Sequence, residues 1–209
     1  MPLALPRFCA ILDRSLRPRL PWEEIGRLLT EAGVRLVQLR AKQATSRMLL
    51  AETRRLLSLL PASTRVIVND RADVAALAGA TGVHLGQGDL PVPAARALLG
   101  LEKTIGFSTH SEEQVEAAVA LPVDYLAFGP IFPTATKADA QPAIGLERLE
   151  KVRKLTGRPL VAIGGITPEN AGAVLEAGAD SVAVISGWLA ARDISGRLEE
   201  FRRALGRLD

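Results

Sequence analysis

The stretch that decides the fold covers residues 160–185 and reads LVAIGGITPENAGAVLEAGADSVAVI. It begins with four uncharged apolar residues, a pattern typical of a parallel strand buried on both faces. After two glycines, Thr167 and Pro168 predict the start of a helix, since proline is favoured at the first helical position. The helix is expected to end at Gly178, because glycine readily forms the left-handed cap, and a second apolar strand follows. This order predicts a βαβ unit with parallel strands.

The same alternation extends over the whole chain. Eight candidate strands cover residues 8–12, 34–39, 66–69, 82–85, 104–108, 125–128, 160–163 and 181–185. Eight strand–helix units predict an α/β protein in which a single (β/α)8 TIM-barrel domain takes up residues 1–209. The alternative is an open, doubly wound sheet. The turn after the first strand, at residues 13–15, lacks the glycines that such a sheet usually carries there.

Composition and charge exclude several classes of protein. Of the 209 residues, 48% are apolar and 23% are charged, which indicates a globular rather than a disordered chain. The net charge is only +3 and the arginines are scattered, so we expect no nucleic-acid partner. The longest uncharged run, residues 74–88, is shorter than the roughly 18 residues needed to cross a bilayer, so we expect no membrane partner. Pro2 and Pro6 interrupt the start where a signal peptide needs an apolar run, and we expect a cytoplasmic protein.

Polar residues and glycines gather where seven of the eight predicted strands end, whereas the loops at the opposite ends look plain. In a barrel, the carboxyl ends of the strands carry the active site. Alternation turns Gln38, Arg40 and Lys42 to the same side after the second strand. Together with Lys137, which follows the sixth strand, Arg40 and Lys42 predict a group of cations at this end. The alternative is that these are three solvated surface charges.

Two aspartates follow successive predicted strands, Asp70 after the third and Asp89 after the fourth. Two carboxylates from adjacent loops suit Mg²⁺, which completes its octahedron with water and substrate phosphate oxygens. The alternative is that Asp70 caps the helix that follows it. Beside a group of cations, the two aspartates predict a site for a metal and a diphosphate.

A second anion site is predicted after the last two strands. Gly164 and Gly165 follow the seventh strand, and Ser186 and Gly187 follow the eighth. In barrels, the backbone N–H groups of these two loops frequently bind phosphate, and glycine lets the backbone approach the anion.

The remaining reactive side chains have structural interpretations. His84 lies within an apolar strand and is expected to be a hydrogen-bonded core residue, whereas His110 is expected only at a helix start. Cys9, the one cysteine, is expected to be buried and unreactive. A site with two anion pockets, one metal and no evident base favours a reaction in which diphosphate leaves and a second phosphorylated substrate attacks.

Six motifs make the chain resemble the thiamine-phosphate synthase family. They cover residues 37–42, 69–71, 82–91, 105–110, 129–137 and 163–170, in the family's order and spacing. The resemblance implies a (β/α)8 transferase of thiamine biosynthesis. It would couple 4-amino-2-methyl-5-hydroxymethylpyrimidine diphosphate to a thiazole phosphate, giving thiamine phosphate and diphosphate. In this family diphosphate leaves before the unprotonated thiazole nitrogen attacks, so no general base is required.

The resemblance also implies roles for individual residues. The implied catalytic residues are Arg40, Lys42, Ser108 and Lys137. The implied ligands of a Mg²⁺ cofactor are Asp70 and Asp89. The implied substrate-binding residues are Gln38, Leu39, Arg40, Ala41, Lys42, Asn69, Ser108, Thr134, Ala135, Thr136, Lys137, Gly165, Ile185 and Ser186. Among these, Gln38 would contact the pyrimidine, and the Gly165, Ile185 and Ser186 positions would hold the phosphate of the thiazole.

Two residues depart from the family pattern: Ala41 replaces an expected glutamate, and Cys9 replaces a common tyrosine. Two other functions stay open, a thiazole tautomerase of the same superfamily and a non-catalytic binder of thiamine precursors. Tautomerases tend to lose the pattern that Thr134, Thr136 and Lys137 retain here, so the residues favour the synthase. We expect small-molecule substrates as partners and leave a homo-oligomer open.

Overall fold

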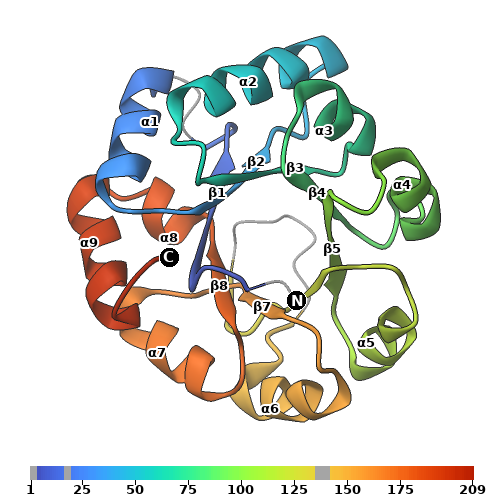
Figure 1. The fold of residues 1–209 in the computed structure, drawn as a ribbon. Coiled ribbons are helices and arrows are strands. Elements are labelled where there is room, and N and C mark those ends of the chain that lie inside the picture. The colour runs from blue at the N-terminus through green and yellow to red at the C-terminus, as the bar shows by residue number, and fades with distance from the viewer. Residues whose placement is uncertain (1–3, 17–19, 135–141) are drawn as a thin grey trace.

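The computed structural model describes residues 4–16, 20–134 and 142–209. In it eight parallel strands close into one barrel, in which each strand pairs with the next along the chain and β8 pairs with β1 (Figure 1). The strands are β1 Phe8–Asp13, β2 Leu36–Arg40, β3 Arg65–Asn69, β4 Gly82–Leu85, β5 Thr104–Thr109, β6 Tyr125–Phe128, β7 Leu160–Ile163 and β8 Ser181–Val184. The helices are α1 Trp22–Glu31, α2 Ser46–Leu59, α3 Ala72–Ala78, α4 Val92–Leu99, α5 Glu112–Val119, α6 Gly145–Leu155, α7 Pro168–Glu176, α8 Ser186–Leu189 and α9 Ile194–Leu205. The predicted (β/α)8 barrel is confirmed, and the open sheet is wrong.

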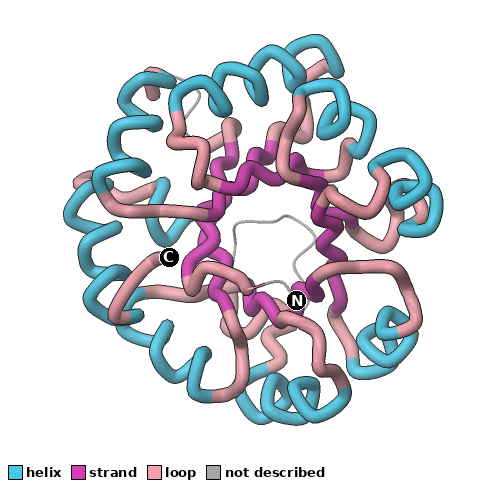
Figure 2. Tube along the Cα trace, in the orientation of Figure 1, coloured by secondary structure: helices cyan, strands magenta, loops and turns pink. Residues whose placement is uncertain are grey.

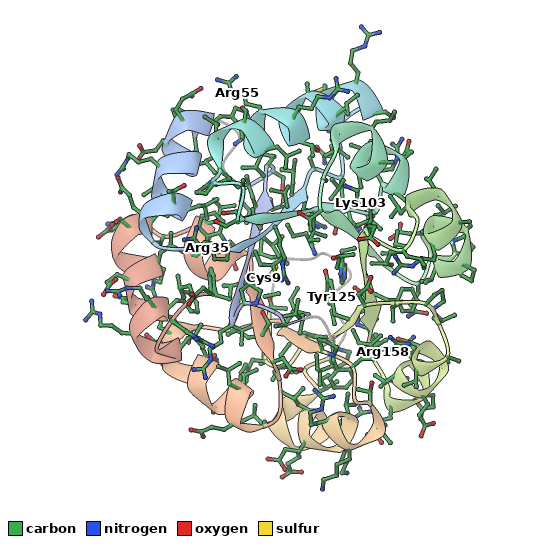
Figure 3. The ribbon with its side chains drawn as sticks, in the orientation of Figure 1. Cys9, Arg35, Arg55, Lys103, Tyr125 and Arg158 are labelled. Atoms are coloured by element: carbon green, nitrogen blue, oxygen red, sulfur yellow. The ribbon has the colours of Figure 1, made fainter. Side chains whose placement is uncertain are left out.

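The helices form an outer ring around the strands, as Figure 2 shows. Outward-facing strand residues such as Leu39 and Val68 belong to one large apolar cluster with the helices. Inward-facing residues form a smaller cluster inside the barrel, and Figure 3 shows two of its members, Cys9 and Tyr125, within the ring of strands. Because both faces of the sheet are buried, the strands read as continuous apolar runs.

Six strand boundaries differ from the prediction by one or two residues, and the differences at the carboxyl ends of β1 and β2 matter at the site. The strand β1 extends to Asp13, and β2 starts two residues later than predicted and reaches Arg40. Backbone pairing is the reason: Asp13 lies opposite Arg40 in the register, and the Arg14 N–H donates to the Arg40 carbonyl at 3.0 Å. Asp13 and Arg40 therefore lie side by side at the carboxyl end of the barrel.

At the amino end of the barrel, basic side chains hold the loops that lead into the strands. Arg158 donates to the carbonyls of Val123 at 2.6 Å and Leu121 at 3.1 Å. Lys103 donates to the carbonyl of Ala80 at 2.6 Å, and Figure 3 labels both basic residues. These bonds satisfy loop carbonyls outside the strand ladder. Composition does not reveal these contacts, because they join long side chains to backbone carbonyls.

Three pairs of neighbouring strands are tied at this amino end by a side-chain oxygen. The residue directly before β4, β6 or β8 accepts a backbone N–H from the preceding strand at 2.7 to 3.0 Å. The acceptors and their donors are Thr81 with Val66, Asp124 with Ile105, and Asp180 with Leu160. Arg35, whose side chain has no acceptor, occupies this position before β2. The pair β1–β2 is joined at the carboxyl end instead, by Asp13 and Arg40.

Two other expectations concern burial and the membrane. Cys9 is buried, as predicted, and burial raises the pKa of its thiol to about 12, which disfavours the reactive thiolate. Within residues 4–16, 20–134 and 142–209, no helix has both the length and the apolar character that crossing a bilayer requires.

Candidate active site

A cavity of about 330 Å³ lies inside the barrel and reaches the loops that follow the strands. Inward-facing strand residues such as Ile11, Val161 and Ala183 form its apolar floor. Eight of the predicted site residues line the cavity: Gln38, Arg40, Lys42, Asn69, Asp70, Asp89, Ser108 and Ile185. The cavity therefore combines an apolar floor with a charged rim, as a substrate with an apolar ring and an anionic group requires.

The cationic part of the rim comes from the end of β2. Arg40 and Lys42 both line the cavity, as the alternation of side chains predicts. The Arg40 guanidinium donates to the Asp13 carboxylate, whose side chain is only 3% exposed. The other carboxylate oxygen of Asp13 accepts from the Ser15 N–H at 3.0 Å and the Ser15 hydroxyl at 2.6 Å. Arg40 is therefore a fixed residue of the cavity wall, and the alternative of a solvated surface charge is wrong for it.

The acidic part of the rim comes from the loops after β3 and β4. Asp70 has a positive φ of 65°, and residues other than glycine seldom adopt such a backbone outside functional sites and turns. The residue that caps α3 is Arg71, and it makes no capping bond through its side chain. The alternative that Asp70 caps this helix is therefore wrong. The Asp89 carboxylate accepts the Gly86 N–H at 2.6 Å, which holds it within its loop.

The two aspartates contact each other through their carboxyl groups. Burial, the charge of Asp89 and the hydrogen bond between the two carboxyls raise the pKa of Asp70 to about 6, while Lys42 and Arg40 act in the opposite direction. Two carboxylates that repel each other form a donor set that a hard divalent cation fits. Among the described residues, no group of three or more His, Cys, Asp or Glu side chains could hold a metal. The donor set thus suits a cation that also binds water and substrate oxygens.

A hydrogen-bonded chain of side chains crosses the cavity wall between β4, β5 and β6. The His84 ring is within hydrogen-bond distance of the Tyr125 hydroxyl through Nδ1, at 2.9 Å, and of the Ser108 hydroxyl through Nε2, at 2.8 Å. The Tyr125 hydroxyl also bonds to the Gln38 side chain. Gly106 makes room for this arrangement, since a Cβ there would lie 2.0 Å from Cζ of Tyr125. The prediction of a buried, hydrogen-bonded His84 is confirmed, and the histidine also orients Ser108.

His110 makes contacts through both its backbone and its ring that a position at a helix start does not require. Its backbone N–H donates to Oε1 of Gln114 at 2.8 Å, and its Nδ1 lies 2.7 Å from the carbonyl of Gly129. The side chain also lines the cavity. The expectation that His110 only marks a helix start is wrong, because its ring contacts the Gly129 carbonyl at the wall of the cavity.

Several predicted site residues do not line the cavity with their side chains. Leu39 is fully buried in the outer apolar cluster, and Ala41 packs against the same cluster. Strand alternation places them behind Gln38 and Arg40. Ser186 begins α8 directly after the lining residue Ile185. Thr134 is described in the loop after β6. Three further predicted residues lie outside the described ranges: Ala135, Thr136 and Lys137.

Gly165 lies next to the loop after β6. Its φ is +61°, and an added Cβ would lie 2.6 Å from the Pro133 carbonyl oxygen and 2.7 Å from Cβ of Phe132. Both contacts are closer than real Cβ atoms allow. The close packing of two loops explains this glycine, so a side chain here would displace the loop after β6.

The sequence model of the thiamine monophosphate synthase family matches residues 8–188. The chain belongs to this family. The thiamine-phosphate synthase of Koribacter versatilis is 47% identical over 207 residues, which cover 97% of each chain. That of Albidiferax ferrireducens is 52% identical over 164 residues, covering 78% of this chain and 75% of the relative.

A solved structure gives the same result. The thiamine phosphate pyrophosphorylase from Pyrococcus furiosus superposes with a TM-score of 0.86 at 36% identity, over 96% of this chain and 95% of that chain. The predicted function, synthesis of thiamine phosphate by a transferase, is confirmed by these relatives of the thiamine monophosphate synthase family. Nothing in them supports the tautomerase or the non-catalytic binder.

Besides the role of His110, the sequence prediction for this member of the thiamine monophosphate synthase family missed Asp13, Tyr125 and Gln87. Asp13 was detectable, because it shares the inward alternation of Cys9 and Ile11 and would be an acid inside the barrel. Tyr125 had the same signal at the start of β6. Gln87, which lines the cavity and donates to the Ser108 carbonyl at 2.7 Å, lies in a loop where no periodicity applies.

Proposed function

We propose that the chain couples 4-amino-2-methyl-5-hydroxymethylpyrimidine diphosphate to a thiazole phosphate in the cavity described above. The bond between the pyrimidine methylene carbon and the diphosphate oxygen breaks, and its electron pair leaves with diphosphate. The lone pair of the thiazole ring nitrogen then forms the new carbon–nitrogen bond. That nitrogen carries no proton, so the reaction needs no general base, and the products are thiamine phosphate and diphosphate.

One observation above all supports this proposal: two cations and two carboxylates share the rim of a cavity with an apolar floor. Arg40 and Lys42 are placed to bind the diphosphate, and fixed positive charges stabilise the charge that develops on a leaving group. We assign Asn69 to the same group. Lys137, from the loop after β6, would complete the set according to the family resemblance.

We further propose that Asp70 and Asp89 hold Mg²⁺. Their oxygens are hard ligands from two adjacent loops, and their mutual repulsion raises the free energy of the empty site. A bound Mg²⁺ supplies electrostatic neutralisation of the diphosphate. The Gly86 N–H, from the same loop, holds the Asp89 carboxylate in place.

The pyrimidine ring belongs, in this proposal, on the floor of the cavity. Gln38 and Ser108 lie at the two ends of the chain of hydrogen bonds through Tyr125 and His84. Such fixed polar groups orient a heterocycle without reacting with it. The thiazole phosphate is assigned to the ends of β7 and β8, with contacts from Gly165, Ile185, Ser186, Thr134, Ala135 and Thr136. Leu39 and Ala41 could contact substrate only through their backbone.

A product assay tests the proposed function directly. The purified chain is incubated with both substrates and Mg²⁺, and thiamine phosphate and diphosphate are quantified separately. We expect equal amounts of the two products and neither product when one substrate is omitted. Chelation of the divalent cation should stop the reaction, and Mg²⁺ should restore it.

The same assay separates the alternatives. A tautomerase would convert one thiazole isomer into another without the pyrimidine diphosphate and without a divalent cation. A binder would retain both precursors without forming any product. Either result in a folded preparation would contradict the proposed function.

A further inference from the structure

The Asp13 carboxylate has two sets of partners, and each occupies a different oxygen. One oxygen accepts from the Arg40 guanidinium, and the other accepts from both the backbone and the hydroxyl of Ser15. The side chain is 3% exposed, whereas that of Arg40 is 13% exposed and lines the cavity. Asp13 therefore lies behind Arg40, between it and the main chain of β1.

This arrangement leaves Arg40 few orientations. A guanidinium has five N–H donors in a rigid, planar fork, so holding one edge also sets the direction of the other edge. The backbone reinforces the geometry, because the Arg14 N–H donates to the Arg40 carbonyl at 3.0 Å and the two strands pair Asp13 with Arg40. The charge of Arg40 also acts on the Asp70 carboxylate. Without Asp13, that aspartate would be the competing partner for the guanidinium.

We propose that Asp13 is a positioning residue, which holds the Arg40 guanidinium toward the diphosphate and away from the two aspartates of the rim. This inference rests on the proposed function, since it takes diphosphate as the anion that Arg40 binds. It goes beyond that function because Asp13, which is not among the residues that line the cavity, would act only through Arg40. A buried carboxylate is unfavourable without a paired cation, so Asp13 also depends on Arg40.

The test begins with Asp13→Asn. Asparagine has the same shape but a single acceptor oxygen, so it cannot serve both Arg40 and Ser15. We expect the KM for the pyrimidine diphosphate and the dissociation constant of inorganic diphosphate each to rise about tenfold, as for a binding group displaced by a fraction of an ångström. The KM for the thiazole phosphate should stay within about twofold of the wild type.

A double-mutant cycle distinguishes positioning from a general structural role. If Asp13 acts only through Arg40, the double variant D13N/R40A should match Arg40→Ala alone within about twofold. The matched control is Asp124→Asn, which removes a carboxylate that pairs with Arg96 at the opposite end of the barrel. That control should lower the Tm and leave both diphosphate measurements unchanged.

The remaining outcomes also decide the proposal. Wild-type constants for Asp13→Asn, or additive effects in the cycle, would overturn it. If Asp13→Asn does not fold, Ser15→Ala replaces it: Ser15 is exposed, and loss of its hydroxyl should raise the diphosphate constants about two- to fivefold. Unchanged constants in Ser15→Ala would then overturn the proposal. Inorganic diphosphate binding, measured by calorimetry, stays informative even if the wild-type chain forms no thiamine phosphate, so failure of the proposed function is distinguishable.

Discussion

The two ends of the barrel use the same residue types for opposite purposes. At the amino end, Arg158 donates to the carbonyls of Val119, Leu121 and Val123, so its guanidinium holds backbone segments together. At the carboxyl end, Arg40 binds a single carboxylate and lines the cavity. A cation in this barrel is structural where carbonyls surround it, and it is placed for function where a carboxylate fixes it beside the cavity. Substitutions at the two ends should therefore separate stability from catalysis.

Lys137→Ala is expected to have the largest effect on catalysis. Removing one electrostatic stabiliser of a leaving group typically costs roughly 10²-fold in turnover. The Tm should change little, because the family resemblance places this residue in a substrate loop. Steady-state kinetics with saturating substrates measure the effect. A variant with a raised KM and a normal kcat would instead show that Lys137 binds the diphosphate uniformly.

Asp89→Asn should lower turnover at least about tenfold, since a ligand of the proposed Mg²⁺ loses its charge. The fold should persist, because asparagine still has an oxygen for the Gly86 N–H and no longer repels Asp70. Turnover and thermal unfolding are measured on one preparation, alongside Asp124→Asn from the other end of the barrel. If Asp89→Asn kept full turnover, the metal assignment would be rejected.

The pH dependence of Mg²⁺ binding should reveal Asp70. Its pKa of about 6 lies above the ordinary value of 3.8, so the folded chain keeps a proton that the unfolded chain releases. In the absence of metal, the Asp70 contribution to stability is greatest below about pH 4 and is lost as the pH rises through 6. Mg²⁺ needs the carboxylate form, so it should raise the Tm more at pH 7.5 than at pH 5. An equal rise at both pH values would contradict the assignment.

Arg158→Met should leave turnover unchanged and cost stability alone. Methionine retains much of the apolar stem but none of the donors to the three carbonyls. Losing hydrogen bonds from a charged group is worth about 1.5–3 kcal/mol. For a chain of this length, that corresponds to a fall in Tm of roughly 3–12 °C. Calorimetry and the product assay together check it, and a loss of kcat without a loss of Tm would break the distinction between the two ends.

Much of the fold could be predicted because its signals are local. Apolar runs followed by helical patterns predicted eight strands, and the residues at their carboxyl ends included Asp70, Asp89 and Arg40. The partner of Arg40 could not be predicted in this way. It depends on which residue of β1 lies opposite Arg40, and the predicted strands stopped one residue short of Asp13 and of Arg40.

The contacts at the amino end could not be predicted from the sequence for a different reason. Arg158 and Lys103 bind backbone carbonyls, which every residue has, so no sequence pattern marks the partner. The chain of bonds through His84 also escaped prediction as a unit. The Tyr125 ring fits only because Gly106 has no side chain. This arrangement depends on three adjacent strands together, so no single stretch of sequence predicts it.

The ties between neighbouring strands have a consequence for local opening. Before β4, β6 and β8 a side-chain oxygen joins two strands at the amino end, which is opposite the rim of the cavity. The pair β1–β2 is joined by Asp13 and Arg40, within the cavity wall itself. A bound anion that contacts Arg40 would therefore also stabilise the contact between β1 and β2, which runs through Asp13. When inorganic diphosphate binds, amide hydrogens of β1 and β2 should slow in exchange more than those of the strand pairs that are tied at the amino end.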